Sequence, residues 1–333
     1  MKNNVTSERT MEFIKQNAIV LVLILEFIFF TINTDNFLSA SNLFNVLRQV
    51  STTGIVCVGM TFVMITGGID LSVGAEVGLS VVVCASLMVN GWGILPACIA
   101  AILAAMLVGF INGLLVANVG IPSLIATLGT QTAVRGAVYI WTNCLPIFGF
   151  PEEFRVLGQG YILGVIPVPV VIMLCVLILA WVYINMTKYG RYTYAIGGNE
   201  EVTRLSGIKV KVMKNATYVI SGFCAGLAGV ILLSRLFSGQ PRAGINYEMD
   251  AITAVVLGGV SVTGGAGRLS GVIVGFLIIG LLSNGFTMMG VNEYWQTFLK
   301  GIILLTAVGL DVRSVSRRKK QVVIDADSSG SAQ

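Results

Sequence analysis

The chain has 333 residues, of which 55% are hydrophobic and only 11% are charged, and it carries a net charge of +5. Soluble domains carry about 25% charged residues, so this composition predicts an integral membrane protein with short loops and no appended soluble catalytic domain. There is no histidine, which removes the commonest general base, proton relay and metal ligand. We therefore expect neither catalytic residues nor a metal site.

Apolar runs, most of them close to the ~20 residues that a bilayer requires, follow one another along the chain. Their length favours an all-α membrane fold over a β-barrel. The run at 250–263 is too short to cross unless residues 247–250 are drawn in, so we expect a half-helix there. The sequence predicts about ten transmembrane helices, at 18–33, 46–66, 71–89, 95–117, 122–142, 162–185, 215–234, 250–263, 269–288 and 294–310.

The Lys and Arg residues are distributed unevenly among the connecting segments. With the amino terminus inside, 15 of the 21 fall on the inner side and four on the outer side, while Arg135 and Lys300 lie within spans. Basic residues favour the cytoplasmic side of a membrane. We therefore expect a cytoplasmic segment at 1–17, a transmembrane domain at 18–313 and a cytoplasmic, disordered tail at 314–333, with both termini and the loop at 186–214 in the cytoplasm.

The loop at 186–214 holds six of the 21 basic residues and the pair Glu200–Glu201. Its middle predicts a two-turn helix at 200–206, because Asn199 is a good N-cap and Gly207 can take the left-handed position after the last turn. Val202 and Leu205 share one face of this helix, which indicates docking to a second protein. A simpler interpretation of the loop's lysines is that they only keep the loop inside.

Two similar glycine-rich segments interrupt the apolar runs, GGIDLSVG at 67–74 and LGGVSVTGG at 257–265. Duplicated, glycine-interrupted segments indicate a transport pathway between two internal repeats. Chance similarity of two glycine-rich turns is the alternative. The glycines expected to break helices are Gly67, Gly68, Gly74, Gly258, Gly259, Gly264 and Gly265.

A broken helix frees backbone polar groups, which are tolerated at membrane depth only when they are buried in protein or line water. Asp70 can accept a hydrogen bond from a polyol in such a pathway, or it can simply cap the helix that begins at Leu71. For the uncharged candidates, hydrogen bonding between helices is the alternative. The candidate pathway residues are Asp70, Asn112, Thr127, Gln131, Asn284 and Gln296.

The dipeptide Gly-Lys does not occur, so there is no phosphate-binding loop of the P-loop type. We expect no cofactor on this chain, with any ATP and Mg²⁺ held by a partner chain, and no nucleic-acid partner. The long outer loops, 143–161 and 235–249, either dock a soluble partner or are ordinary solvated loops.

Five segments in the same order resemble the monosaccharide permeases of bacterial ATP-binding-cassette (ABC) importers, of the ribose, xylose and galactose permease type. They are GGIDLSVG at 67–74, ANVGIPSLIATLGT at 117–130, YAIGGNEEVTRLSGIKV at 194–210, VVLGGVSVTGGAGRLSG at 255–271 and GVNEYWQTFLKGIILLTAV at 290–308. The resemblance implies ten membrane helices per chain in the bacterial cytoplasmic (inner) membrane, surrounded by lipid. It also implies a second permease copy, cytoplasmic ABC ATPases and a periplasmic or lipid-anchored sugar-binding protein.

In such permeases the loop after the sixth span carries the coupling helix that contacts the ATPase. Residue by residue, this role falls on Gly198, Asn199, Glu200, Glu201, Val202, Arg204, Leu205, Gly207 and Ile208. The resemblance implies an ATP-driven importer of a monosaccharide. The alternative that the residues leave open is a proton-coupled secondary transporter of a small polar solute, acting through Glu26, Asp70 or Glu76, since ionisable residues within spans mark proton and substrate routes.

Overall fold

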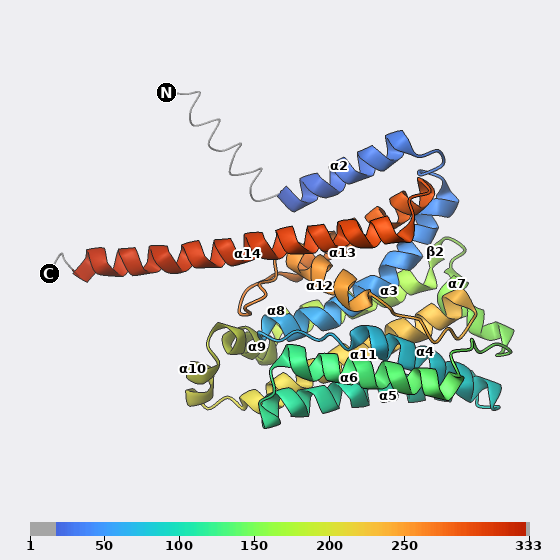
Figure 1. Ribbon diagram of the computed structural model, residues 1–333, viewed down its shortest axis with the longest axis horizontal. Coiled ribbons are helices and arrows are strands. Elements are labelled where there is room, and N and C mark those ends of the chain that lie inside the picture. The colour runs from blue at the N-terminus through green and yellow to red at the C-terminus, as the bar shows by residue number, and fades with distance from the viewer. Residues whose placement is uncertain (1–17, 331–333) are drawn as a thin grey trace.

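The structure, a computed structural model, describes the backbone of residues 18–330 and the side chains of residues 19–312. Helices lie side by side in a bundle (Figure 1), and the predicted segment 1–17 lies outside the described residues. The main helices are α2 (Ala18–Asn33), α3 (Ala40–Ile65), α4 (Val73–Val89), α5 (Ile94–Leu114), α6 (Ser123–Thr142), α8 (Val168–Met186), α11 (Val210–Leu236), α12 (Tyr247–Leu257), α13 (Leu269–Met288) and α14 (Glu293–Gly330).

Shorter elements connect these helices at the two ends of the bundle. They are the π-helical turn η1 (Leu115–Val119), the 3₁₀ turn η2 (Glu152–Arg155), α7 (Val156–Gln159), the strands β1 (Tyr161–Ile162) and β2 (Ile166–Pro167), α9 (Lys188–Gly198) and α10 (Glu200–Leu205). The two strands pair antiparallel, Tyr161 with Pro167 and Ile162 with Ile166. Figure 1 shows α9 and α10 at one end of the bundle and the β-hairpin at the other. We call the end that carries α9 and α10 the knob end and the opposite end the hairpin end.

The predicted all-α membrane fold is confirmed, and each of the ten apolar runs overlaps one of the main helices. By length and composition, α3, α5 with η1, α8, α11, α13 and the part of α14 up to Val312 can each span a membrane, whereas α2 and α4 are shorter apolar helices. The half-helix is also confirmed: α12 has 11 residues, or about 16 Å at 1.5 Å per residue, against a hydrocarbon core of about 30 Å.

Two boundaries differ from the sequence prediction. We expected the sixth span to begin at 162, but α8 begins at Val168 because the chain turns back at Leu163 and Gly164, both with positive φ, to form the β-hairpin. The backbone of α14 is helical to Gly330, into the segment for which the sequence predicts disorder. The side chains beyond Val312 lie outside the description, so the cytoplasmic placement of 314–333 remains a prediction.

The centre of the bundle is α11, which packs against α3, α4 and α5. Small residues bring these helices close together: a Cβ added at Gly222 would lie 2.6 Å from the Ala105 carbonyl oxygen, and one at Gly226 would lie 2.9 Å from the Cα of Ile102. Backbone approach through small residues is the usual way in which membrane helices pack. Tyr218 of α11 is fully buried in this core. The core is therefore close-packed, and it connects the two ends of the bundle.

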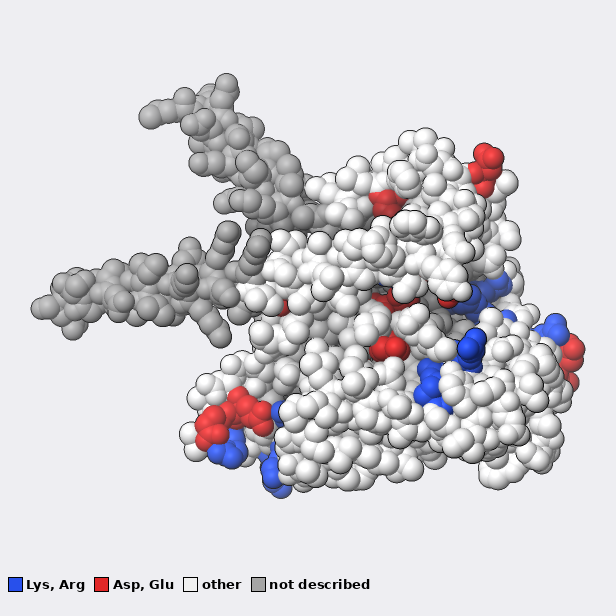
Figure 2. All heavy atoms as spheres, in the orientation of Figure 1, with Lys and Arg blue, Asp and Glu red and all other residues white. Residues whose placement is uncertain are grey.

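Charged side chains are sparse on the visible face of the molecule: one cluster lies at the knob end, and others lie at the opposite end and in the middle of the face (Figure 2). At the hairpin end, the segments that follow α6 and α11 are folded together. Ile147 and Gly239 exchange two backbone hydrogen bonds, the Ser234 hydroxyl donates to the carbonyl of Phe154, and the Arg155 guanidinium lies 4.0 Å from the centre of the Phe237 ring. Both long loops thus form one structured surface.

Candidate functional site

The segment 199–208, which we call the knob, begins and ends as its residue types predict. Asn199 is the N-cap of α10, and its side-chain oxygen accepts a hydrogen bond from the Val202 amide at 3.0 Å. Gly207 has a φ of +82°, so it takes the left-handed position that ends a helix. Both predicted caps are confirmed. The sequence missed α9, which precedes the knob and is capped by the Thr187 hydroxyl.

The surface of the knob divides into paired charges and free apolar side chains. Glu201 pairs with Arg204 at 2.6 Å, and Glu200 pairs with Lys214 at 2.9 Å. Val202 and Leu205 are 57% and 77% exposed. Because the charges are paired within the chain, the exposed apolar pair is the part of the knob best suited to burial against another protein.

Directly behind the knob, three glycine segments meet backbone to backbone. The amide of Gly265 donates to the carbonyl of Ile65 at 2.9 Å, and a Cβ added at Gly264 would lie 2.7 Å from the Gly67 nitrogen. A Cβ at Gly197 would fall on the same Ile65 oxygen. We call this contact of 65–68, 197–198 and 264–265 the glycine junction. It joins the last turn of α9 to the break between α3 and α4 and to the break between α12 and α13.

The first of these breaks has its freed backbone amides satisfied by side chains. Ile69 donates to the Ser123 hydroxyl at 3.2 Å and Leu71 donates to the Thr127 hydroxyl at 3.1 Å. The Ser72 amide donates to an Asp70 carboxylate oxygen at 3.0 Å, so Asp70 holds the turn before α4, which begins at Val73 and not at Leu71. At the second break Asp311 of α14 has the same role.

The side chain of Asp311 reaches back to the segment between α12 and α13. One of its carboxylate oxygens accepts from the Val262 amide at 3.1 Å and from the Ser261 hydroxyl at 3.2 Å. Each break therefore holds its own aspartate, Asp70 in the first and Asp311 in the second. Satisfying the freed backbone in this way lets a broken helix persist at membrane depth.

Three of the predicted pathway residues come together around the first break. The Asn112 amide donates to the Ser72 hydroxyl at 2.7 Å, and Ser72 lies within hydrogen-bond distance of both Asp70 and Glu76. The second Asp70 oxygen accepts from Ser221 of α11 at 2.8 Å. Asp70, Asn112 and Thr127 are fully buried, so the structure places them in packed protein, where they hold α4, α5, α6 and α11 together.

Two more candidates also make contacts between segments. Gln131 donates to Glu248 at 3.1 Å, and Asn284 of α13 exchanges two hydrogen bonds with Asn42 of α3. Arg135, which lies within a predicted span, donates to the carbonyl oxygens of Gly74, Pro241 and Ala243. Of the six predicted pathway residues, Gln296 lines the pocket described next.

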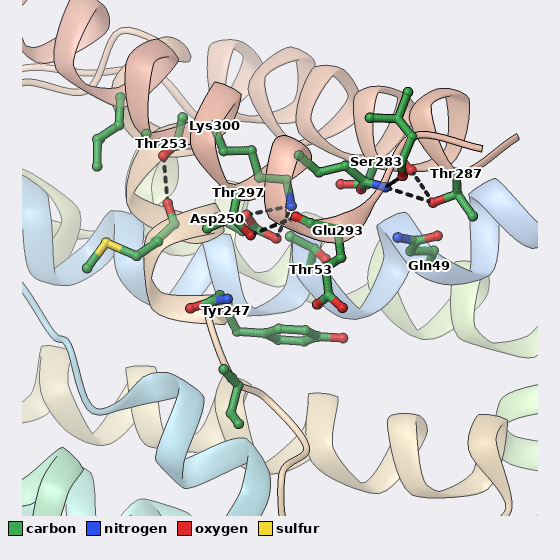
Figure 3. Close-up of a pocket in the computed structure, with 17 residues that line it drawn as sticks. Gln49, Thr53, Tyr247, Asp250, Thr253, Ser283, Thr287, Glu293, Thr297 and Lys300 are labelled. Atoms are coloured by element: carbon green, nitrogen blue, oxygen red, sulfur yellow. Dashed lines mark hydrogen bonds and ion pairs between the residues drawn. The ribbon is translucent and has the colours of Figure 1, made fainter. Parts of the chain in front are cut away.

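That pocket lies toward the hairpin end, between α3, α12, α13 and α14, and has a volume of about 610 Å³. Both carboxylate oxygens of Asp250 lie within 3.0 Å of the Lys300 ammonium. Their side chains are 17% and 20% exposed. Figure 3 shows this ion pair with Thr53, Glu293 and Thr297 around it. We call the space the Asp250–Lys300 pocket.

Sequence reasoning did not find this ion pair. Asp250 and Lys300 are 50 residues apart in sequence, and no local motif connects them. A usable signal was present, however, because Lys300 is the only lysine within a predicted span. A buried charge of this kind requires a partner, and Asp250 begins the short run that α12 occupies.

The bundle of apolar helices, the paired helix breaks and the polar pocket define a multi-pass membrane permease. Residues 42–308 match the family described as "Branched-chain amino acid transport system / permease component", and the chain belongs to this family.

Curated relatives match most of the chain. It is 46% identical over 278 residues to the ribose import permease protein RbsC of Bacillus subtilis (strain 168), covering 83% of this chain and 86% of that protein. It is 43% identical to RbsC of Haemophilus influenzae, covering 93% and 97% of the two chains. Identity to the D-allose transport system permease protein AlsC of Escherichia coli (strain K12) is 37%, over 89% of this chain and 91% of that protein. No solved structure matches the chain.

Proposed function

We propose that this chain is the permease subunit of an ATP-driven ABC importer and that its substrate is a monosaccharide of the ribose type. The observation that carries the proposal is the 43–46% identity to ribose import permeases over most of both chains. The D-allose permease shares 37% of positions, so an aldohexose is the second substrate to test. The exposed apolar pair on the knob supports a protein partner on that side.

The proposal includes an assembly around the permease. Two copies of the chain form a homodimer in the bacterial cytoplasmic membrane with both termini in the cytoplasm. A separate ABC ATPase binds ATP and Mg²⁺ and docks on the knob, and a periplasmic or lipid-anchored sugar-binding protein docks on the surface formed by 143–161 and 235–249. The excess of Lys and Arg on the knob side supports this orientation of the chain in the membrane.

The coupling route follows from the glycine junction. The carboxyl end of α9 touches both helix breaks through backbone atoms, and α10 begins directly after it. Closely packed backbones transmit displacement with little loss because interiors of this density have low compressibility. A movement of the knob by the ATPase is therefore passed to the α3–α4 and α12–α13 connections together.

The function is tested in proteoliposomes that contain the permease, its ATPase and its sugar-binding protein. ATP on the same side of the membrane as the ATPase, enclosed in the vesicles, is expected to drive uptake of labelled ribose. Ribose-loaded binding protein is expected to stimulate ATP hydrolysis. A protonophore should leave uptake unchanged. Uptake that needs a proton gradient and no partner chain would contradict the proposal and favour the secondary transporter.

The docking role of the knob is tested with the double variant Val202→Ser/Leu205→Ser. Burying one such side chain fully contributes about 1.5–3 kcal/mol, so affinity for the ATPase is expected to fall tenfold or more, measured as binding of the purified ATPase to permease in nanodiscs. The control is Arg191→Ala, which is exposed on α9 outside the knob. Equal ATPase affinity in the double variant and in the control would exclude the knob as the docking surface.

A further inference from the structure

The Asp250–Lys300 pocket has the features of a ligand site rather than a packing defect. Its volume of about 610 Å³ falls within the range of about 300–1,000 Å³ that small-molecule pockets occupy. It is built from four helices that approach from different parts of the chain, and its lining combines the ion pair with uncharged hydrogen-bonding groups. The uncharged Asn, Gln, Ser and Thr side chains are Gln49, Thr53, Asn246, Thr253, Ser283, Thr287, Gln296 and Thr297.

Some of these groups are free to bind a ligand. Among the described residues, the Gln49 amide and the Thr53 hydroxyl have no hydrogen-bond partner, and the carboxylate of Glu293 forms no ion pair. Figure 3 shows Gln49, Thr53 and Glu293 without dashed lines beside the Asp250–Lys300 pair. Glu293 is exposed and Gln49 is half-buried, so either water or a ligand can bind these groups.

The ion pair itself is unusual for its position. Lys300 lies in the apolar part of α14 that is long enough to span a membrane, and charged residues there mark substrate routes because they are expensive to bury. Asp250 and Lys300 neutralise each other, so the pocket attracts neither strong anions nor strong cations through this pair. Together they offer carboxylate acceptors and ammonium donors within 3.0 Å of one another.

We propose that this pocket is a transient binding position for the imported monosaccharide on its way through the permease, an inference that rests on the proposed function. Sugar hydroxyls accept hydrogen bonds from Lys300 and donate them to Asp250, while the Gln49 amide does both. The ring of Tyr247, which lines the same pocket, provides an apolar face for the sugar's C–H groups.

The lining favours a neutral polyol over a branched-chain amino acid, the other substrate that the family description names. A branched apolar side chain needs an apolar compartment. Eight uncharged polar side chains surround this ion pair, against four apolar ones, Ile245, Met249, Val291 and Leu304. Binding here is weak because the sugar must replace an existing ion pair. Weak binding suits a transporter, since a substrate that enters must also leave.

Occupancy is tested by protection of an introduced cysteine in the assembled transporter. In a Cys144→Ser/Cys175→Ser background, which removes the exposed native cysteines, Thr297→Cys places a thiol in the pocket. Ribose is expected to slow its reaction with a small water-soluble thiol reagent, and leucine is not. The matched control is Asp35→Cys, an exposed position between α2 and α3 outside the pocket, where neither solute should change the rate.

The contribution of the ion pair is tested with Asp250→Asn/Lys300→Met, which removes both charges and so leaves no buried charge unpaired. Ribose uptake at equal ATPase activity is expected to fall about tenfold or more, because hydrogen bonds to charged groups are about twice as strong as those between neutral groups. The control Asp35→Asn removes an exposed charge between α2 and α3, outside the pocket, and should leave uptake unchanged.

The outcomes separate this inference from the proposed function. If the wild-type complex imports ribose with ATP but ribose does not protect Thr297→Cys, or the double variant imports ribose at the wild-type rate, the pocket is not on the pathway although the function stands. Protection by leucine and not by ribose overturns the sugar assignment. If the wild-type complex imports no sugar, the proposed function fails and the inference fails with it.

Discussion

The glycine junction and the Asp250–Lys300 pocket are both built at interruptions or ends of helices, yet they are opposite in character. At the junction, three backbones touch and leave no room for a Cβ at Gly197, Gly264 or Gly265. At the pocket, four helices leave about 610 Å³ between them. Backbones in direct contact can pass on a displacement. Polar side chains that line an open space can instead exchange their hydrogen-bond partners for a ligand.

The two regions also differ in how their polar groups are hydrogen-bonded. The helix breaks at the junction have backbone amides held by fixed acceptors such as Thr127, Asp70 and Asp311. In the pocket, Gln49 and Thr53 have no partner among the described residues. Backbone amides held by fixed acceptors favour a rigid connection, whereas polar side chains without a partner in an open pocket can bind a ligand. This contrast agrees with the proposed coupling at the knob end and the proposed substrate contact at the hairpin end.

The largest effect is expected from Gly197→Ala, which places a Cβ on the Ile65 oxygen at the centre of the junction. Overpacking costs about 1–3 kcal/mol even where side chains can adjust, and here the neighbour is backbone. The thermal unfolding temperature of purified permease should fall clearly. The neighbouring Gly198→Ala is the control, because an added Cβ there meets nothing within 4 Å. Equal unfolding temperatures would show that the junction is not close-packed.

An intermediate effect is expected in the pocket when only one charge is removed. Lys300→Met leaves Asp250 without its partner, and since the pair is partly exposed, the loss of stability should lie between the values for exposed and buried pairs, at about 1–3 kcal/mol. The double variant Asp250→Asn/Lys300→Met should recover most of it. Additive losses in a thermal double-mutant cycle would contradict a direct interaction between these two groups.

The smallest effect is expected from Tyr194→Phe on α9. The Tyr194 hydroxyl donates to the Gly267 carbonyl at 2.9 Å, and burial raises the pKa of this hydroxyl, which Arg268 offsets only in part, so it remains a donor at neutral pH. Removing one hydrogen bond costs about 0.5–1.5 kcal/mol. Sugar-stimulated ATPase activity should fall while basal activity stays unchanged.

The control for this change is Tyr192→Phe on the same helix. No hydrogen bond of the Tyr192 hydroxyl is present among the described residues, and its ring packs against the small cluster of Ile196, Val210 and Met213. If both variants reduce stimulated ATPase activity equally, the bond to Gly267 has no special part in coupling.

The features that sequence predicted correctly are those with local signals. Asn199 and Gly207 mark the ends of α10 through their own side chain and backbone preference, and the short apolar run showed that α12 is a half-helix. The sequence missed α9, because KYGRYTYAIGG contains three glycines and β-branched or aromatic residues that are weak helix formers. Thr193 and Ile196 of this helix are buried against the rest of the protein, and local sequence does not reveal such contacts.

The candidate site was predicted less well because its contacts are distant in sequence. Asp70, Asn112 and Thr127 were expected along a pathway, and the structure places them in the packed interior around the first helix break. Asp250 and Lys300 meet only when α12 and α14 pack together. Composition identified which polar groups required partners but not which partners they have.

The most direct test of the separation between substrate contact and coupling is the number of ribose molecules imported per ATP hydrolysed. It is measured in proteoliposomes for two variants side by side. For Asp250→Asn/Lys300→Met, we expect ATP hydrolysis stimulated by loaded binding protein to persist while import falls, so the ratio drops. For Val202→Ser/Leu205→Ser, hydrolysis and import should fall together, so the ratio changes little. The same ratio in both variants would contradict the separation of substrate contact from coupling.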